Sequence, residues 1–182
     1  MRNSGEADCK LHSPRVRGLA LAVLFSAGLA LSGCARSARP GQRAPDFKVR
    51  TERGQIRTLA SYRGRVLVLN FWASWCPPCI AETQSLEQLH QALRGQPVSI
   101  LAISQDQSRR AYRNFLRAEK VNFTTARDPG ARIPHRYGTV KIPETYIIAP
   151  DGRVARKIVS AYDWSKPKMI RYLKNLARGR RR

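Results

Sequence analysis

Residues 66–79 of the chain read VLVLNFWASWCPPC. The continuous apolar run 66–71 has the length of one strand, and its lack of alternation predicts a strand that is buried on both faces. The following residues, Pro77–Leu93, place apolar side chains at helical spacing. The stretch therefore predicts a buried strand, a short connection and a helix, with Cys76 and Cys79 at the start of that helix.

A Cys-x-x-Cys pair is either a redox-active dithiol or one half of a zinc site. A structural zinc ion needs about four ligands, and the other two cysteines, Cys9 and Cys34, lie in the N-terminal segment. His90 and His135 are too far apart in the sequence for a metal-ligand spacing. The pair is therefore interpreted as a redox pair, and no metal site is expected.

The predicted position of Cys76 favours its thiolate form. It lies at the N-cap of the helix, where the positive end of the helix dipole and free backbone N–H groups stabilise negative charge. Cys79 follows one turn later, close enough to form a disulfide with it. Pro77 and Pro78 suit the first helical turn, which needs no N–H partner, but Pro78 also removes an N–H that could have solvated the thiolate. We therefore expect moderate activation of Cys76 and a pair that reduces its partners.

The segments around this stretch predict a mixed sheet with helices on both faces. Residues 47–49 and 56–59 flank a turn that contains Gly54 and predict a hairpin. Further strands are expected at 98–104, 121–125, 145–149 and 154–159, and further helices at 109–119, 131–137 (interrupted at Pro134) and 165–177. This order of elements is typical of an α/β domain with a central mixed sheet.

The N-terminal residues have the features of an export signal. The polar segment 1–18 is followed by an apolar run, 19–31, which is too short to span a bilayer comfortably but has the length of a signal-peptide apolar region. Residues 31–34 read Leu-Ser-Gly-Cys, which resembles a bacterial lipobox. We therefore expect residues 1–33 to be a lipoprotein signal peptide and Cys34 to be the lipid attachment site. The alternative is an ordinary signal peptide or an uncleaved anchor.

Such a lipid anchor predicts a location in the cell envelope, on the periplasmic or outer side of the plasma membrane. Ala35 follows the cysteine, and this residue is compatible with export to the outer membrane, which we favour for a Gram-negative host. Residues 34–44 carry arginines without apolar periodicity and are expected to be a lipidated tether. A folded domain over residues 45–178 and a basic tail over residues 179–182 complete the expected organisation.

Composition and charge exclude several classes of protein. Of the 182 residues, 42% are hydrophobic, so a wholly disordered protein is excluded. No apolar run is long enough for a polytopic membrane protein, and four cysteines are too few for a disulfide-stapled miniprotein. The net charge of +22 predicts attraction to anionic surfaces such as lipid headgroups, envelope polysaccharide or acidic proteins. Nucleic acid is not an expected partner, because an exported protein would not meet it.

From about Ala44 to the last predicted helix, the sequence resembles the thioredoxin-fold proteins. More narrowly, it resembles the membrane-anchored extracytoplasmic thiol–disulfide reductases of the TlpA/ResA type. The motifs that carry the resemblance are the Cys-Pro-Pro-Cys stretch at 68–79, the entry Ala-Pro-Asp-Phe at 44–47, Ile142-Pro143 before a predicted strand, and Glu82, three residues after the second cysteine. The resemblance implies a thioredoxin fold with an N-terminal β-hairpin extension, and a cis-proline at Pro143 that faces the cysteines.

The resemblance also implies an enzyme, a protein-disulfide reductase that needs no bound cofactor. Cys76 and Cys79 would form the redox-active disulfide, and Glu82 would complete the catalytic set by accepting the proton of Cys79. The residues expected to contact the substrate are Trp75, Pro77, Pro78, Ile142 and Pro143. The implied partners are disulfide-containing envelope proteins and a membrane thiol electron donor that re-reduces the pair.

Two positions depart from the family pattern. Asn70 stands where classical thioredoxins have a buried Asp, so it cannot accept a proton. Glu82 is then the nearest carboxylate in the sequence. Glu144 and Thr145 follow the proline, and the resulting Pro-Glu-Thr triplet is similar to the cytochrome c maturation branch of the group. Apocytochrome c is therefore a candidate substrate.

Two other functions are compatible with the sequence. Peroxiredoxins share the fold and the entry motif, but their peroxidatic cysteine has Thr or Ser three residues before it and Pro seven before. This chain has Ala73 and Leu69 at those positions. A non-enzymatic partner that delivers copper or haem could use the two cysteines as soft ligands. Consumption of hydrogen peroxide would favour the first function, and metal-bound protein from the envelope the second.

Overall fold

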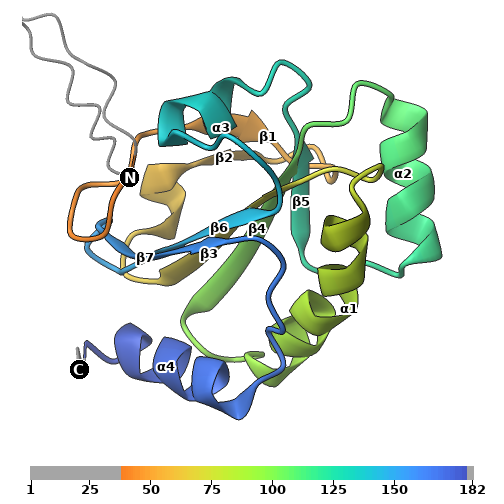
Figure 1. Cartoon of the computed structure of the whole chain (residues 1–182). Coiled ribbons are helices and arrows are strands. Elements are labelled where there is room, and N and C mark those ends of the chain that lie inside the picture. Colours follow the sequence, from red (N-terminus) through yellow and green to blue (C-terminus); the bar gives the residue numbers. More distant parts are fainter. Residues whose placement is uncertain (1–37, 180–182) are drawn as a thin grey trace, which may run out of the picture. The chain divides into compact units, whose positions relative to one another are not determined.

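A five-stranded mixed sheet forms the centre of the structure, a computed structural model that describes residues 38–179 (Figure 1). From edge to edge, its strands are β5 (Thr124–Arg127), β4 (Val98–Ser104), β3 (Val66–Trp72), β6 (Glu144–Ile148) and β7 (Val154–Val159). The strands β3, β4 and β5 are parallel, whereas β6 runs antiparallel to both β3 and β7. The mixed central sheet predicted from the sequence is confirmed.

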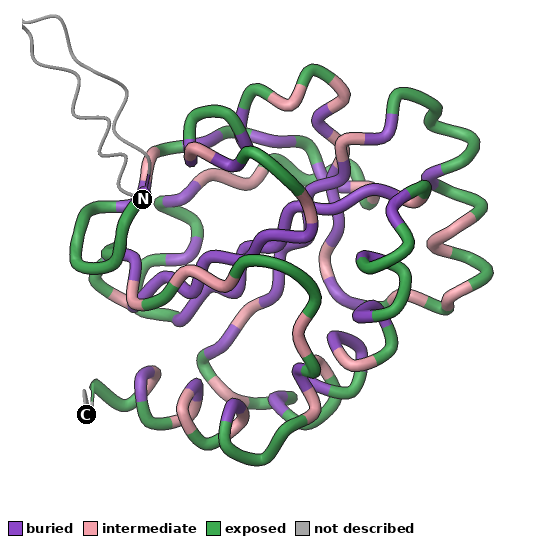
Figure 2. The backbone as a smooth tube through the Cα atoms, viewed as in Figure 1, coloured by how far each residue is buried: buried purple, intermediate pink, exposed green. Residues whose placement is uncertain are grey.

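The central strand β3 is buried along its whole length, as its apolar run predicts. Val66, Val68 and Trp72 pack into one hydrophobic core, and Leu67 and Leu69 pack into a second one. This division arises because successive side chains of a strand point to opposite faces of the sheet. Figure 2 shows the buried residues concentrated along the sheet. The strand that leads into the cysteine pair is therefore held from both sides.

Helices cover both faces of the sheet, as predicted. One core is completed by the helices α1 (Pro77–Ala92), α2 (Arg109–Ala118) and α4 (Pro167–Ala177). The other is completed by the short helix α3 (Arg132–Tyr137), the 3-10 turn η1 (Leu59–Tyr62) and the strand β1 (Lys48–Arg50). The helix that carries the cysteines thus belongs to the layer of three longer helices.

The predicted N-terminal hairpin is also present. The strand β1 pairs antiparallel with β2 (Ile56–Thr58). Gly54 in the turn has a φ of 80°, a conformation that L side chains rarely adopt. The turn η1 that follows has no counterpart among the predicted elements. It is closed by a capping box in which Thr58 and Ser61 bond to each other's backbone N–H.

Two further departures from the predicted elements have a clear physical reason. β5 begins at Thr124 rather than at Val121, because the Val121 N–H bonds to the Leu116 carbonyl and completes the turn that leaves α2. The helix α3 continues through Pro134, where an interruption was predicted. Pro134 is the third residue of that helix, and an N–H at this position has no intrahelical partner to lose.

The segment 38–44 lies against the domain, although the sequence predicts a tether there. Ala38 donates its N–H to the Tyr137 carbonyl at 3.0 Å, and Gly41 donates its N–H to the Val154 carbonyl at 2.8 Å. The side chain of Ala38 is buried in the core that contains α3. The folded unit therefore begins earlier in the chain than predicted.

Several predictions concern residues that the structure does not describe. The expected signal peptide 1–33, the lipid attachment site Cys34 and the end of the basic tail, residues 180–182, lie outside the described residues. Within residues 38–179, no helix combines the length and the apolar character needed to cross a bilayer.

Candidate active site

The cysteine pair lies where the central strand passes into its helix. β3 ends at Trp72, a short connection follows, and Cys76 is the N-cap of α1 in an extended conformation. Pro77 occupies the first helical position, as predicted. A disulfide joins Cys76 to Cys79 with a Cα–Cα distance of 5.3 Å. The pair predicted to be redox-active is thus bonded at the positive end of the helix dipole.

The connection that leads to Cys76 is fixed by a buried carboxylate. Asp106 is 1% exposed and follows the end of β4. Its carboxylate accepts hydrogen bonds from the Ser74 N–H at 3.0 Å, from the Ser74 hydroxyl at 2.6 Å and from the Ser104 hydroxyl. The position of the cysteine loop is therefore set by the neighbouring parallel strand, a role for Asp106 that sequence reasoning missed.

The two sulfurs face different surroundings. Both cysteines are buried, with exposed fractions of 4% for Cys76 and 1% for Cys79, and both belong to the same hydrophobic core. Of the two, Cys76 lines a surface cavity of about 430 Å³ and Cys79 does not. The Cys76 sulfur lies 3.8 Å from the carbonyl oxygen of Ile142. The peptide bond between Ile142 and Pro143 is cis, as predicted from the resemblance. Of the two cysteines, Cys76 is thus the one that a docked molecule could reach.

Apolar side chains form part of the rim of the cavity beside Cys76. Trp75 and Val140 have exposed fractions of 65% and 95%. The predicted contact residues Pro77, Pro78 and Ile142 line the same cavity. Sequence reasoning missed the remaining lining residues, which are Gln105, His135, Thr139, Val140 and Lys141. The arrangement offers an extended molecule an apolar rim next to a reactive sulfur.

Glu82 lies inside the protein, on the α1 face that also carries Cys79. It is 3% exposed, and its carboxylate accepts hydrogen bonds from Asn70 Nδ2 at 2.8 Å, from the Tyr162 N–H at 3.1 Å and from Trp164 Nε1 at 3.4 Å. Burial raises the pKa of the Glu82 carboxyl, and the three hydrogen bonds offset part of that rise. The raised pKa brings the Glu82 carboxyl closer to the pH at which a proton-transfer group works.

Asn70 connects this carboxylate to the strand that follows the cis-proline. Its side-chain nitrogen donates to Glu82 and also to the Thr145 hydroxyl at 2.9 Å. Asn70 and Thr145 are direct neighbours in the β3–β6 register. Asn70 is therefore a hydrogen-bond donor that holds Glu82 in place.

A small cavity lies behind Cys79, lined among others by Asn70, Trp72 and Thr83. The indole nitrogen of Trp72 is the one buried side-chain nitrogen or oxygen that lacks a hydrogen-bond partner within the described part of the chain. The inner sulfur thus faces a mainly apolar enclosure, which disfavours a charged thiolate.

Comparison with known proteins identifies the family. Residues 40–157, more than half of the chain, match the model of the AhpC/TSA family. The chain belongs to the AhpC/TSA family.

The relatives of this AhpC/TSA family member are named for thiol chemistry. Thiol-disulfide oxidoreductase ResA of Bacillus thuringiensis subsp. konkukian is 31% identical over 75% of this chain and 78% of the relative. ResA of Bacillus subtilis is 30% identical over 65% of this chain and 66% of the relative. A crystal structure of a Chlorobium tepidum protein named for the DsbE thiol:disulfide interchange proteins is 27% identical, with a TM-score of 0.68, and covers 79% of this chain and 99% of that one. This protein is therefore a thiol–disulfide oxidoreductase with a thioredoxin-like fold.

The structure brings most of the residues predicted for this AhpC/TSA family site into one region. Trp75, Pro77, Pro78 and Ile142 share a cavity with Cys76, while Pro143 is buried beside it. Sequence reasoning missed two of the three residues that donate hydrogen bonds to Glu82. Tyr162 and Trp164 lie between β7 and α4, far from Glu82 in the sequence, and no local pattern indicates the contact.

A second buried carboxylate lies directly after the cis-proline of this AhpC/TSA family member. Glu144 is 1% exposed and forms an ion pair with Lys157 on the neighbouring strand, with Nζ 2.6 Å from Oε1. The same oxygen accepts hydrogen bonds from the hydroxyls of Tyr146 and Thr139. Glu144 therefore fixes the loop that contains Pro143 rather than extending into solvent.

Proposed function

We propose that this oxidoreductase reduces disulfides in proteins of the cell envelope, with apocytochrome c among the candidate substrates. The observation that carries the proposal is the different placement of the two cysteines. Cys76 lines the surface cavity, whereas Cys79 does not and lies on the helix face that carries Glu82. A reductase needs one accessible sulfur to attack and one protected sulfur to resolve.

The first step is the attack of the Cys76 thiolate on a substrate disulfide. A bond forms between Cys76 and one substrate sulfur, the substrate disulfide breaks, and the second substrate sulfur leaves as a thiolate. The N-terminal position on α1 supports the thiolate of Cys76. Docking of the substrate chain is assigned to Trp75, Ile142, Pro77 and Pro78, which line the cavity, and the buried Pro143 supports Ile142 from behind through their cis peptide bond.

The second step resolves the mixed disulfide. The Cys79 thiol transfers its proton to Glu82, and the resulting thiolate attacks the Cys76 sulfur. The bond between Cys76 and the substrate breaks, and the substrate leaves as a thiolate that takes up a proton from water. The substrate has then gained two electrons, and the Cys76–Cys79 pair has lost them. Renewal of the starting form, a Cys76 thiolate and a Cys79 thiol, needs two electrons from a membrane thiol donor, whose own thiols become a disulfide, and Glu82 returns to Cys79 the proton that it accepted. No bound cofactor takes part.

The envelope location rests on the sequence before residue 38. The apolar run 19–31 and the lipobox-like residues 31–34 support a signal peptide, a lipid on Cys34 and attachment to a membrane surface, the outer membrane in a Gram-negative host. In such a compartment, disulfide-bearing proteins are available as substrates, and nucleic acid is absent. Cys34→Ser should release the chain from membranes or leave its leader unprocessed, and an unchanged detergent requirement would contradict the lipid.

Trapping tests the reductase proposal most directly. Cys79→Ser in the full chain removes the resolving sulfur, so mixed disulfides between Cys76 and its substrates should accumulate and be released by dithiothreitol. Cys76→Ser is the matched control and should trap nothing. Reduced wild-type chain should also reduce insulin disulfides. Failure to reduce insulin together with equal trapping by both variants would overturn the proposal.

A further inference from the structure

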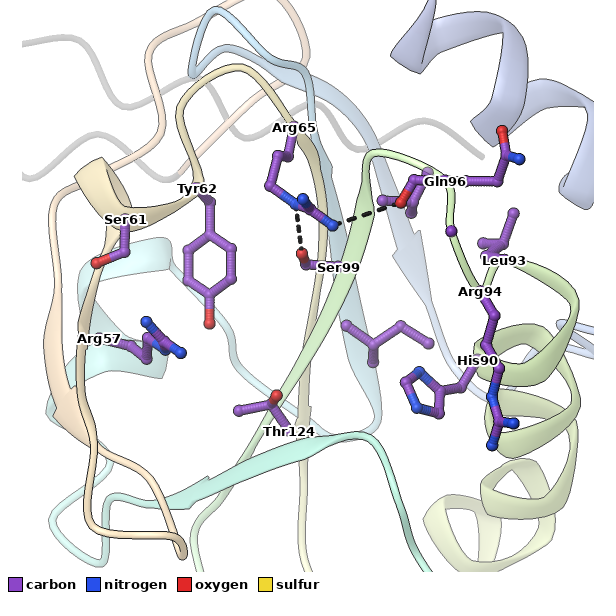
Figure 3. A pocket seen from close by; sticks show the side chains of 13 residues that line it. Arg57, Ser61, Tyr62, Arg65, His90, Leu93, Arg94, Gln96, Ser99 and Thr124 are labelled. Carbon is purple, nitrogen blue, oxygen red and sulfur yellow. Dashed lines mark hydrogen bonds between the residues drawn. The ribbon is translucent and has the colours of Figure 1, made fainter.

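A second cavity lies at the end of the sheet opposite the cysteine pair. It has a volume of about 480 Å³ and is bordered by β2, by the turn after η1, by the C-terminal end of α1 and by the first residues of β4 and β5 (Figure 3). This volume lies in the range of small-molecule sites in proteins. None of its lining residues borders the cavity beside Cys76.

Basic side chains from separate parts of the chain meet in this cavity. Arg57 comes from β2, and Arg65 directly precedes β3. His90 lies in the last turn of α1, and Arg94 follows the end of that helix. In Figure 3, Arg57 approaches from one side and His90 and Arg94 from the other, with Arg65 above them. Among the described residues, no Asp or Glu lines the cavity. The fold therefore gathers positive charge here without a carboxylate to neutralise it.

Hydrogen bonds to uncharged groups hold two of the guanidinium groups in the cavity, and no carboxylate of the described residues pairs with them. Arg65 donates from Nε to the Ser99 hydroxyl at 3.1 Å, and Arg57 donates to the side-chain oxygen of Gln55 at 2.7 Å. Across residues 38–179, neither of these arginines nor Arg94 forms an ion pair with a carboxylate. Arg65 also donates from Nη2 to the Gln96 carbonyl at 3.4 Å, so its side chain is held in place by two uncharged acceptors (Figure 3). These arginines keep further N–H groups with which to bind an anion.

The lining of the arginine cavity also includes uncharged hydrogen-bond donors, of which Tyr62 is the largest. The hydroxyl of Tyr62 points into the cavity between Arg57 and Thr124 (Figure 3). Burial raises the pKa of Tyr62, an effect that the charge of Arg57 reduces only in part. The phenol therefore keeps its proton at neutral pH and can donate a hydrogen bond next to a guanidinium.

We propose that this cavity binds a phosphate-bearing anion through Arg57, Arg65 and Arg94. Guanidinium groups pair with phosphate oxygens in a bidentate manner, and such charge-assisted hydrogen bonds are stronger than neutral ones. A phosphate group offers enough acceptor oxygens to engage several guanidinium groups and a phenol at once. The phosphate could belong to a soluble compound or to a lipid headgroup, and the two sources are separated by experiment.

The site would act independently of the disulfide. α1 has 16 residues, so its two ends are about 24 Å apart, with Cys76 at one end and Arg94 beyond the other. A ligand in the arginine cavity leaves the surface around Cys76 uncovered. Disulfide reduction should therefore be unchanged by variants of the arginine cavity, and the inference does not depend on the proposed direction of the redox reaction.

The test measures pyrophosphate binding to the full chain by titration calorimetry at constant ionic strength. The double variant Arg57→Gln/Arg94→Gln should weaken binding by about tenfold or more, since each lost charge-assisted hydrogen bond is substantial. Arg110→Gln/Arg171→Gln is the matched control. It removes the same charge from exposed positions on α2 and α4 that do not line the cavity, and it should change affinity by less than about twofold. Equal weakening by both double variants, or no binding to the wild-type chain, would overturn the site.

A second arm identifies the source of the phosphate. The same variants are sedimented with phosphatidylcholine vesicles prepared with and without phosphatidic acid. A lipid headgroup is the ligand if the cavity variant loses its binding to phosphatidic acid vesicles and the control variant keeps it. A soluble phosphate compound is the ligand if only pyrophosphate binding depends on the cavity.

Discussion

Asn70 and Glu82 are joined by a 2.8 Å hydrogen bond that ties the middle of the central strand to the second turn of α1. The bond places a carboxylate of raised pKa on the same helix face as the resolving cysteine. Because the Asn70 amide donates a hydrogen bond and cannot accept a proton, it is compatible with the proposed role of Glu82 as the proton acceptor, for which an Asp at position 70 would compete.

Glu82→Gln should slow the resolution of the mixed disulfide and alter the pH dependence of Cys79. Gln keeps the shape of the side chain but cannot accept the thiol proton. Its amide can be accommodated if the Asn70 amide turns over, so the fold should persist. Single-turnover rates across a pH series measure the effect. Glu87→Gln, a buried Glu on the same helix whose pKa is lowered, is the control. Identical pH–rate profiles for wild type and Glu82→Gln would remove Glu82 from the mechanism.

The stability of the protein should depend on pH in opposite directions through Glu82 and Glu87. Burial raises the folded-state pKa of Glu82 above 4.5, so its stabilising contribution is complete below that pH and is lost as the pH rises through the folded value. Hydrogen bonds, chiefly from Asn122, lower the pKa of Glu87 despite burial, so its contribution is present above 4.5 and is lost as the pH falls through the folded value. Urea unfolding at several pH values should show Glu82→Gln gaining relative stability towards neutral pH and Glu87→Gln losing it.

Asp106→Ala should cost about 2–3 kcal/mol of unfolding free energy, because it leaves the buried hydroxyl of Ser104 and the partly buried donors of Ser74 without an acceptor. The rate of disulfide exchange should fall as well, since the loop before Cys76 loses its attachment to β4. Denaturant unfolding and insulin reduction measure the two effects. Asp163→Ala is the control, an exposed Asp whose hydrogen bonds are local, and it should change stability by less than about 0.5 kcal/mol.

Lys157→Met should destabilise the protein by about 2 kcal/mol, because Glu144 is then a buried carboxylate without its ion-pair partner. The double variant Glu144→Gln/Lys157→Met should recover much of the loss, since it removes the unpaired charge. A double-mutant cycle from urea unfolding provides the measurement. Additive losses in the double variant would show that the ion pair does not hold the loop after Pro143.

The reduction potential of the Cys76–Cys79 couple should lie nearer to that of thioredoxin, about −270 mV, than to that of a strong oxidant at about −120 mV. The reason is the position of the pair at the start of α1, where Pro78 removes one N–H that would otherwise stabilise the thiolate. Equilibration with glutathione buffers gives the value. A potential above roughly −180 mV would identify an oxidant and contradict the proposed direction of electron flow.

The features that sequence reasoning predicted correctly are those encoded by local patterns. The apolar run 66–71 specifies a strand buried on both faces, and the residues after it specify the helix that begins at Pro77. The cis-proline at Pro143 followed from a family motif. In each case, a few adjacent residues contain all the information that the prediction needs.

The features that were missed depend on contacts between distant segments. Tyr162 and Trp164 bond to Glu82 only because the chain after β7 returns over α1. Asp106 bonds to Ser74 only because β4 lies parallel to β3. The Arg57 and Arg94 side chains border the same cavity for the same kind of reason. Periodicity and turn propensity describe neighbours along the chain, so they cannot indicate which remote donor will meet a buried carboxylate.

The hydrogen bond from Ala38 to the Tyr137 carbonyl gives the domain a mechanical property. The same carbonyl accepts a hydrogen bond from the Tyr146 hydroxyl, and residues 139–142 of the following loop border the cavity at Cys76. A pull on the chain ahead of Ala38 would load that carbonyl first, and the strain would pass into the loop that the substrate must contact. Tension applied at the N-terminal end would therefore act on the loop that borders the disulfide site.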